Sequence, residues 1–132
     1  MRRLLVGIVL LMPLLASAAG EGAWMASSNG VIMQNRGMSA SSSPLSPPQP
    51  VNGLVTTVQW EYKLIGPQPA NLLVRLCSQS RCVELDAGSG STRAFDGIPA
   101  IESMHFVWDV PGSGRLYPAL QVLSNRVIVN YR

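Results

Sequence analysis

The sequence predicts an all-β protein, an antiparallel β-sandwich of about seven or eight strands, with a small barrel as the second choice. Apolar and polar residues alternate along most of the chain, and the part after the N-terminal apolar run lacks the i, i+3, i+4, i+7 spacing of an amphipathic helix. Gly- and Pro-containing turns separate these alternating segments. A chain of this length is enough for one domain with one hydrophobic core.

The first eighteen residues are typical of a secretory signal peptide. Arg2 and Arg3 precede an apolar run, and Ala16-Ser17-Ala18 offers small residues at the positions that signal peptidase recognises. We expect cleavage after this site, which leaves an exported domain of residues 19–132. The apolar run is shorter than the roughly 20 residues that span a bilayer, which argues against the alternative of a membrane anchor. No later apolar segment is long enough either, so we expect no membrane span in the mature chain.

The charge balance argues against nucleic acid as a partner. The full chain has 10 basic and 7 acidic residues, so without Arg2 and Arg3 the mature chain has 8 basic and 7 acidic residues, a net charge of +1. The basic residues are scattered singly and form no stripe. Neither nucleic acid nor an anionic membrane surface is therefore an expected partner.

The strands can be placed in order along the mature chain. Alternation predicts strands over residues 30–36, 54–65, 71–77, 83–86, 92–95, 103–110, 116–123 and 126–131. The clearest is 54–65, in which Leu54, Val58 and Trp60 share the face that we expect to pack against the core. Residues 88–91 are predicted as a flexible turn, and Ser124-Asn125 as the turn of a final hairpin.

The aromatic residues divide into two groups. Trp60, Tyr62 and Trp108 occur in phase with aliphatic residues, so we expect them in the core. Trp24 and Tyr117 lie outside clean alternation, and we expect them to be exposed. Either of these two could anchor an interface.

Residues 39–50 are the one segment of low complexity, composed almost entirely of Ser, Pro, Ala and Gln. Because Pro47, Pro48 and Pro50 cannot donate to a sheet ladder, we predict a Ser/Pro-rich loop that wraps the surface. The alternative is a polyproline-type docking segment for a partner.

Cys77 and Cys82 are the only cysteines, and in an exported domain they predict one disulfide across a hairpin loop. A loop this short gains roughly 2 kcal/mol or less from the crosslink. Zinc needs about four ligands and His105 is the only histidine, so we expect no metal site. The C-x4-C spacing also differs from the C-x-x-C of thioredoxin-like redox sites.

The catalytic inventory is thin, and we expect neither catalytic residues nor a cofactor. His105 alternates with Phe106 and Trp108, so it points away from the core, and the chain has no G-x-S-x-G motif. Glu84 and Asp86 share one strand face, where carboxylates are usually just solvated charge. A cell-wall hydrolase that uses His105 and Glu84 is the weakest alternative.

Several long strings of residues resemble the flagellar protein FlhE family. They are AGEGAW at 19–24, RGxSASSSPLS at 36–46, LCSQSRCVELD at 76–86 and SNRVIVNYR at 124–132. The resemblance covers essentially the whole chain, signal peptide included. It implies a periplasmic, non-enzymatic accessory of flagellar assembly, and it offers no established catalytic residues to carry over.

The resemblance also implies the partners, which are flagellar rod or hook subunits, or proteins of the basal body and export apparatus. The implied role is a chaperone-like factor or a regulator that limits proton leak through the export gate. A β-sandwich can bind such partners through end loops or by strand addition at an exposed edge, which we expect next to proline-rich segments. An exposed edge could also pair with a second copy of the chain.

We expect residues 39–50 and the Cys77–Cys82 hairpin to flank or form the partner surface. The candidate contact residues are Trp24, Ser39, Ser43, Pro44, Pro47, Pro48, Arg81 and Tyr117. The alternative function is a peptidoglycan-binding carbohydrate module, which would stack sugar rings on exposed Trp or Tyr side chains.

Overall fold

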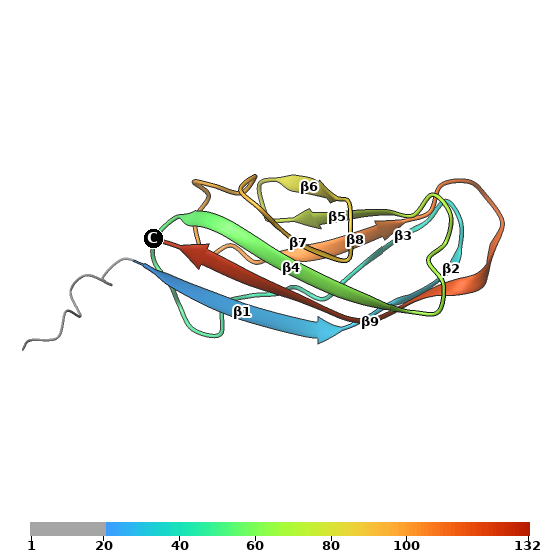
Figure 1. The fold of residues 1–132 in the computed structure, drawn as a ribbon, viewed down its shortest axis with the longest axis horizontal. Coiled ribbons are helices and arrows are strands. Elements are labelled where there is room, and N and C mark those ends of the chain that lie inside the picture. The colour runs from blue at the N-terminus through green and yellow to red at the C-terminus, as the bar shows by residue number, and fades with distance from the viewer. Residues whose placement is uncertain (1–20) are drawn as a thin grey trace, which may run out of the picture.

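The computed structural model describes residues 21–132, and the predicted signal peptide lies outside them. The described chain forms nine strands in two antiparallel sheets, so the predicted β-sandwich is confirmed (Figure 1). The first sheet has the order β1 (Gly22–Asn29), β9 (Arg115–Tyr131), β4 (Val55–Ile65) and β7 (Ser89–Thr92), and β2 (Ile32–Asn35) also pairs with β9. The second has the order β3 (Ser39–Ser41), β8 (His105–Asp109), β5 (Leu73–Cys77) and β6 (Cys82–Leu85).

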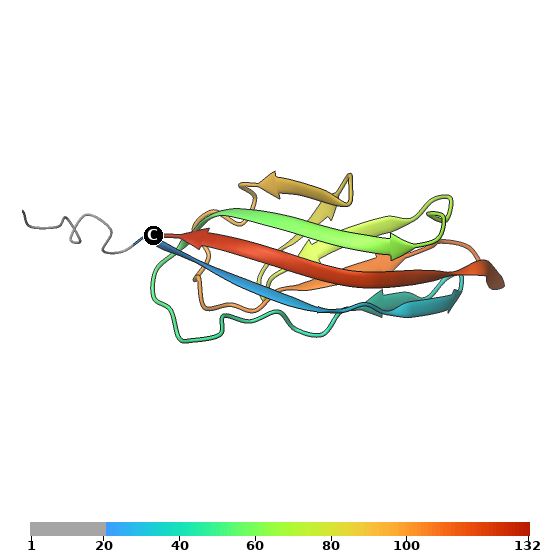
Figure 2. The ribbon, with the colours of Figure 1, turned by 60° about the horizontal axis from the view of Figure 1, so that its bottom comes forward.

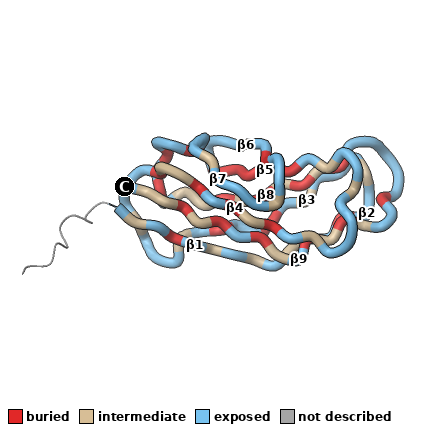
Figure 3. The backbone as a smooth tube through the Cα atoms, viewed as in Figure 1, coloured by how far each residue is buried: buried red, intermediate tan, exposed pale blue. Residues whose placement is uncertain are grey.

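The inner faces of the two sheets pack together as one core. Along the strands, the buried residues of this core alternate with more exposed residues (Figure 3). At its centre the rings of Phe106 and Trp108 stack with centroids 5.6 Å apart, and Tyr62 meets each of them edge-on at 6.1 Å. Trp60 is buried nearby, so the prediction that Trp60, Tyr62 and Trp108 are core residues is confirmed. Burial raises the pKa of the Tyr62 phenol, because it disfavours the ionised form.

The strongly alternating segments fold as predicted. Strands predicted over 30–36, 54–65, 71–77, 83–86 and 103–110 correspond to β2, β4, β5, β6 and β8, with bounds that differ by a few residues. At the start of β4 the predicted facing is wrong, because Leu54 is 52% exposed and Val55 is 1% exposed. A β-bulge between Val55 and Thr57 shifts the alternation there by one residue.

The final hairpin predicted across Ser124-Asn125 is wrong, because β9 runs through it as one strand of 17 residues. Asn125 is 1% exposed and has partners for its side chain in β1. The Ser28 hydroxyl donates to Asn125 Oδ1 at 2.8 Å, and Asn125 Nδ2 donates to the Asn29 carbonyl at 3.2 Å. These bonds satisfy a polar pair that would otherwise favour a turn.

The flexible turn predicted at 88–91 and the short strand predicted at 92–95 are both wrong, since β7 occupies Ser89–Thr92. Gly90 lies directly opposite Trp60 in the neighbouring strand β4. A Cβ atom on Gly90 would lie only 2.6 Å from Cη2 of Trp60. Small residues are therefore present here because the Trp60 ring lies against the β7 backbone.

Strand β1 was not predicted, and the expected exposure of Trp24 is wrong. All eight β1 residues pair with β9, from Gly22 opposite Tyr131 to Asn29 opposite Ser124. Trp24 is 5% exposed, and its indole N–H donates to the Ala100 carbonyl at 2.9 Å. It is the only large apolar side chain that β1 turns inward, which is too little for a periodic pattern.

Only the last part of the segment 39–50, after Leu45, is a loop. Residues 39–41 form β3, and the backbones of Leu45 and Met104 exchange hydrogen bonds of 2.7 and 2.9 Å. Ser42 is bonded to Phe106 through both its amide and its hydroxyl, each at 2.9 Å. Leu45 is 1% exposed, so this part of the segment belongs to the core and the loop prediction is wrong for it.

We predict that Leu45→Ala lowers the free energy of unfolding by roughly 2–5 kcal/mol, because it empties a fully enclosed site. Urea unfolding of the mature protein measures this loss. The matched control is the exposed neighbour Pro44→Ala, which should stay within about 0.5 kcal/mol. Equal, small effects of both substitutions would restore the description of this segment as a loose surface loop.

Candidate functional site

The outer edge of β1 is the longest free strand edge of the described molecule. The Arg132 N–H donates to the Leu54 carbonyl at 2.9 Å, and the Arg132 carbonyl accepts the Leu54 N–H at 3.0 Å. The backbone groups of Arg132, just after the end of β9, therefore point toward the β4 side of the sheet. Backbone groups of successive residues in a strand point to opposite edges, so Val129 and Val127 point toward β1. The backbone groups of Trp24 and Ala26 point back toward Val129 and Val127 and form the ladder with β9. The alternate residues of β1 therefore point their backbone groups away from β9.

The outward-pointing residues are Ala23, Met25 and Ser27, and within residues 21–132 no other strand pairs with this edge. The eight residues of β1 include no charge and no proline, and their register with β9 is unbroken. The other outermost strands, β2, β3, β6 and β7, have only three or four residues each. Charges, prolines, bulges and shortness are usual protections of a strand edge, and β1 has none of these four. Cover by a loop is a further protection, and residues 48–51 run beside only the first half of β1.

A groove of about 490 Å³ runs along the N-terminal half of this edge. Ala23, Trp24, Met25 and Tyr131 line one side of the groove, and residues 48–51 line the other. In both views of the ribbon, the chain between β3 and β4 passes beside the first half of β1 (Figures 1 and 2). We call the edge of β1 together with residues 48–51 the β1 groove.

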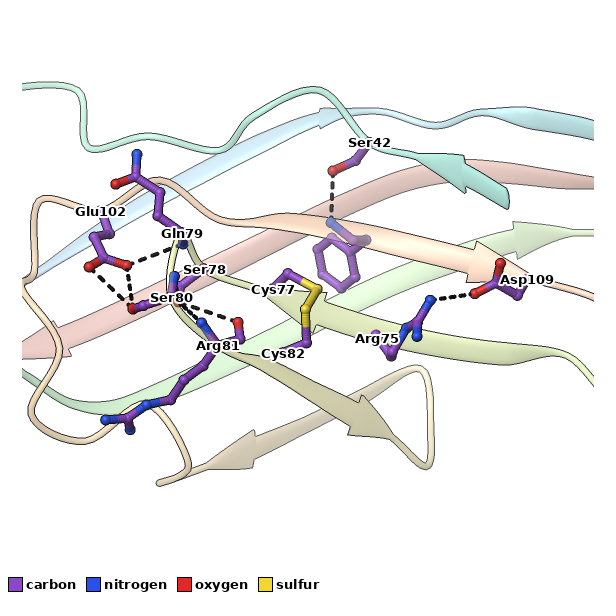
Figure 4. Close-up of a disulfide and its surroundings, with 11 residues drawn as sticks. Ser42, Arg75, Cys77, Ser78, Gln79, Ser80, Arg81, Cys82, Glu102 and Asp109 are labelled. Carbon is purple, nitrogen blue, oxygen red and sulfur yellow. Dashed lines mark hydrogen bonds and ion pairs between the residues drawn. A yellow bond between two sulfur atoms is a disulfide. The ribbon is translucent and has the colours of Figure 1, made fainter. Parts of the chain in front are cut away.

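The predicted disulfide between Cys77 and Cys82 is confirmed, and it closes the loop between β5 and β6 (Figure 4). The loop is held by polar contacts as well. The Ser78 hydroxyl accepts the amide N–H groups of Ser80 and Arg81 at 3.1 and 3.0 Å. The Glu102 carboxylate accepts the Gln79 amide at 3.1 Å and the Ser80 hydroxyl at 3.0 Å. The loop is thus a fixed part of the sandwich.

Comparison with known proteins decides the family. The family model described as flagellar protein FlhE matches residues 30–132. The chain belongs to the FlhE family.

Individual FlhE proteins match over nearly the whole chain. FlhE of Salmonella typhimurium is 64% identical over 124 residues, which cover 94% of this chain and 95% of that protein. FlhE of Escherichia coli K12 is 61% identical over 132 residues, which is all of both chains. A crystal structure of FlhE with 65% identity superposes with a TM-score of 0.85 and covers 86% of this chain and 99% of that one. The resemblance found in the sequence is therefore confirmed.

The predicted contact residues do not form one surface in this FlhE fold. Trp24 and Pro48 line the β1 groove, and Pro47 precedes Pro48. Tyr117 is 82% exposed near the start of β9, whereas the β1 groove lies at the other end of that strand. Arg81 lies on the disulfide loop, where its guanidinium donates to two carbonyl oxygens, at 2.9 and 3.2 Å.

The remaining predicted contact residues, Ser39, Ser43 and Pro44, are exposed along the second sheet and the chain that follows it. The Ser39 hydroxyl bonds to Asp109, which also pairs with Arg75 at 2.7 Å. That any of the predicted residues contacts a partner stays a prediction. Sequence reasoning missed the edge residues of β1, because which strand lies at an edge is a property of topology.

The residues weighed for catalysis lie on the outer face of the second sheet. His105 is paired with Cys77, whereas Glu84 is paired with Arg75, so the two lie in different rows of the sheet. Among residues 21–132, no three His, Cys, Asp or Glu side chains are grouped to hold a metal ion. That part of the chain also has no helix of the length and hydropathy needed to cross a membrane.

We predict that replacing Cys77 and Cys82 together by Ala costs about 2 kcal/mol of unfolding free energy, the chain entropy of so short a loop. The contacts of Ser78 and Glu102 should keep the loop in place. Urea unfolding gives the free energy, and amide exchange at Gln79 and Ser80 reports the loop. The wild-type protein under dithiothreitol is the control, and a loss above about 4 kcal/mol would show that the crosslink alone holds the loop.

Proposed function

We propose that this FlhE-family protein is a periplasmic, non-enzymatic accessory of flagellum assembly that binds rod or hook subunits non-covalently, as a chaperone-like factor. Membership of a flagellar family supports the flagellar role. The single observation that carries the binding role is the unprotected edge of β1 beside a groove of about 490 Å³. Exposed sheet edges bind extended segments of other proteins through main-chain hydrogen bonds.

Two features support the periplasmic location. The sequence begins with a basic, then apolar, then small-residue pattern that is typical of a signal peptide. The described domain also contains a disulfide and no free cysteine, which suits an oxidising compartment such as the periplasm.

The chaperone-like role is a direct use of the β1 edge. In this role the protein keeps rod or hook subunits from assembling in the wrong place. A protein that covers an extended segment of the subunit blocks the contacts that this segment would make. Binding to a component of the export apparatus through the same edge is the form that the regulator role would take.

The carbohydrate-binding alternative depends on exposed tryptophan or tyrosine rings. Sugar stacking needs an exposed aromatic face, and the tryptophans Trp24, Trp60 and Trp108 are all buried. Tyr117 is exposed, but no second exposed aromatic ring accompanies it in the described region to build a platform. We therefore do not propose this function.

A crosslinking pull-down from the periplasm of flagellated cells tests the proposal, with the purified mature domain as bait and mass spectrometry as readout. We expect rod or hook subunits to be recovered. Periplasm from cells that build no flagella and an unrelated disulfide-bonded β-sandwich as bait are the controls. Recovery of export-gate or basal-body proteins would favour the regulator role, and recovery of no flagellar protein would contradict the proposal.

A further inference from the structure

We infer that the β1 groove is a slot for an extended, uncharged segment of a partner polypeptide, which joins the first sheet as an additional strand next to β1. The inference rests on the proposed function for the identity of the partner. It adds how the partner is recognised and which kind of segment is bound.

The backbone of β1 has hydrogen-bonding groups without a strand partner along its outer edge. Ala23, Met25 and Ser27 point their N–H and C=O groups away from β9, at every second residue along an unbroken strand. Donors and acceptors repeat at this spacing along any extended polypeptide, and neighbouring strands lie about 4.8 Å apart. An extended chain is therefore the ligand that satisfies all of these groups together.

The wall of the groove opposite β1 cannot itself pair fully with the strand. Residues 48–51 run beside β1, and Pro48 and Pro50 have no backbone N–H to offer to a ladder. This segment therefore leaves the outward groups of β1 to an incoming chain and encloses that chain from one side.

The residues that line the groove are uncharged. Its lining residues are Ala23, Trp24, Met25, Pro48, Gln49, Pro50, Val51 and Tyr131, none of which is charged at neutral pH. A charged side chain of the partner would lose water here without gaining a counter-ion, which is costly. Charged groups begin at one end, where Glu21 and Arg132 line the adjoining pocket. The slot therefore selects uncharged residues.

A partner segment fits this slot better than a second copy of β1 does. In a two-fold antiparallel β1–β1 pair that uses the whole of β1, the first half of one strand faces the second half of the other. The apolar wall beside Ala23 and Met25 would then meet the polar residues Ser27, Ser28 and Asn29 of the other copy. An apolar segment from a different chain avoids this mismatch.

The test compares variants of the full mature protein in binding to the purified rod or hook subunit that the pull-down recovers. Met25→Pro removes an outward N–H and spares the ladder with β9. Ser27→Lys keeps the backbone and places a charge at the edge. The control, Leu123→Ser, removes an exposed apolar side chain of β9, away from the edge. We expect about tenfold weaker binding for both edge variants and no change for the control. Melting temperatures show that each variant is folded.

Amide hydrogen exchange on the wild-type protein gives a second readout that does not depend on substitution. In the free protein the amides of Ala23, Met25 and Ser27 should exchange fast, whereas those of Trp24 and Ala26 should be protected. Adding the subunit should protect the three outward amides.

The possible outcomes separate the inference from the proposed function. If the subunit binds but the edge variants bind equally well and the outward amides stay unprotected, the slot is wrong and the proposed function stands. If the outward amides become protected in the free protein as its concentration rises, the occupant is a second copy and the inference is overturned. If no rod or hook subunit binds the wild-type protein, the proposed function fails and the inference fails with it.

Discussion

The first sheet depends on the continuity of β9. This strand of 17 residues pairs with β1 and β2 along one edge and with β4 along the other. Its polar midpoint is stabilised by the contacts of Asn125 with Ser28 and Asn29 of β1. Because an unpaired buried amide costs about 1–3 kcal/mol, these contacts also fix the register of β1. A slip of one residue would break them and would turn Trp24 out of the core.

The position of the candidate site follows from that register. With Asn125 fixed, Trp24 points inward and its indole N–H reaches the Ala100 carbonyl, which joins β1 to the segment between β7 and β8. Ala23, Met25 and Ser27 then present their side chains to solvent, with their backbone groups along the free edge. The segment from β3 to β4 passes the same edge, because the backbone of Leu45 is bonded to Met104 just before Pro47, Pro48 and Pro50. The buried Asn125 amide thus determines which residues of β1 point their backbone groups toward the free edge.

Local patterns were sufficient to predict the strands in which one face is fully apolar. The core positions of Trp60, Tyr62 and Trp108 belong to this group. Three of the failures, the turn at 124–125, the turn at 88–91 and the loop at 39–50, share one cause: small and polar residues favour turns and loops until contacts with a distant part of the chain hold them in a strand. Asn125 is satisfied by β1, Gly90 makes room for Trp60, and Ser42 is satisfied by Phe106. These are contacts between residues far apart in sequence, which a local reading cannot weigh.

The candidate site was less accessible to prediction than the fold, for a related reason. Composition drew attention to the prolines of 39–50 and to Trp24, and the structure brings Pro48 and Trp24 to one groove. Composition could not predict that β1 has a free edge, because the order of strands in a sheet depends on the topology of the whole chain. An unprotected edge favours aggregation, so proteins usually shorten, charge or cover such strands. Here the four outermost strands other than β1 are short, and β1 is instead bordered along its first half by prolines that cannot extend a ladder. This arrangement limits what can be added to the sheet while leaving the edge open, which is what a site for one added strand requires.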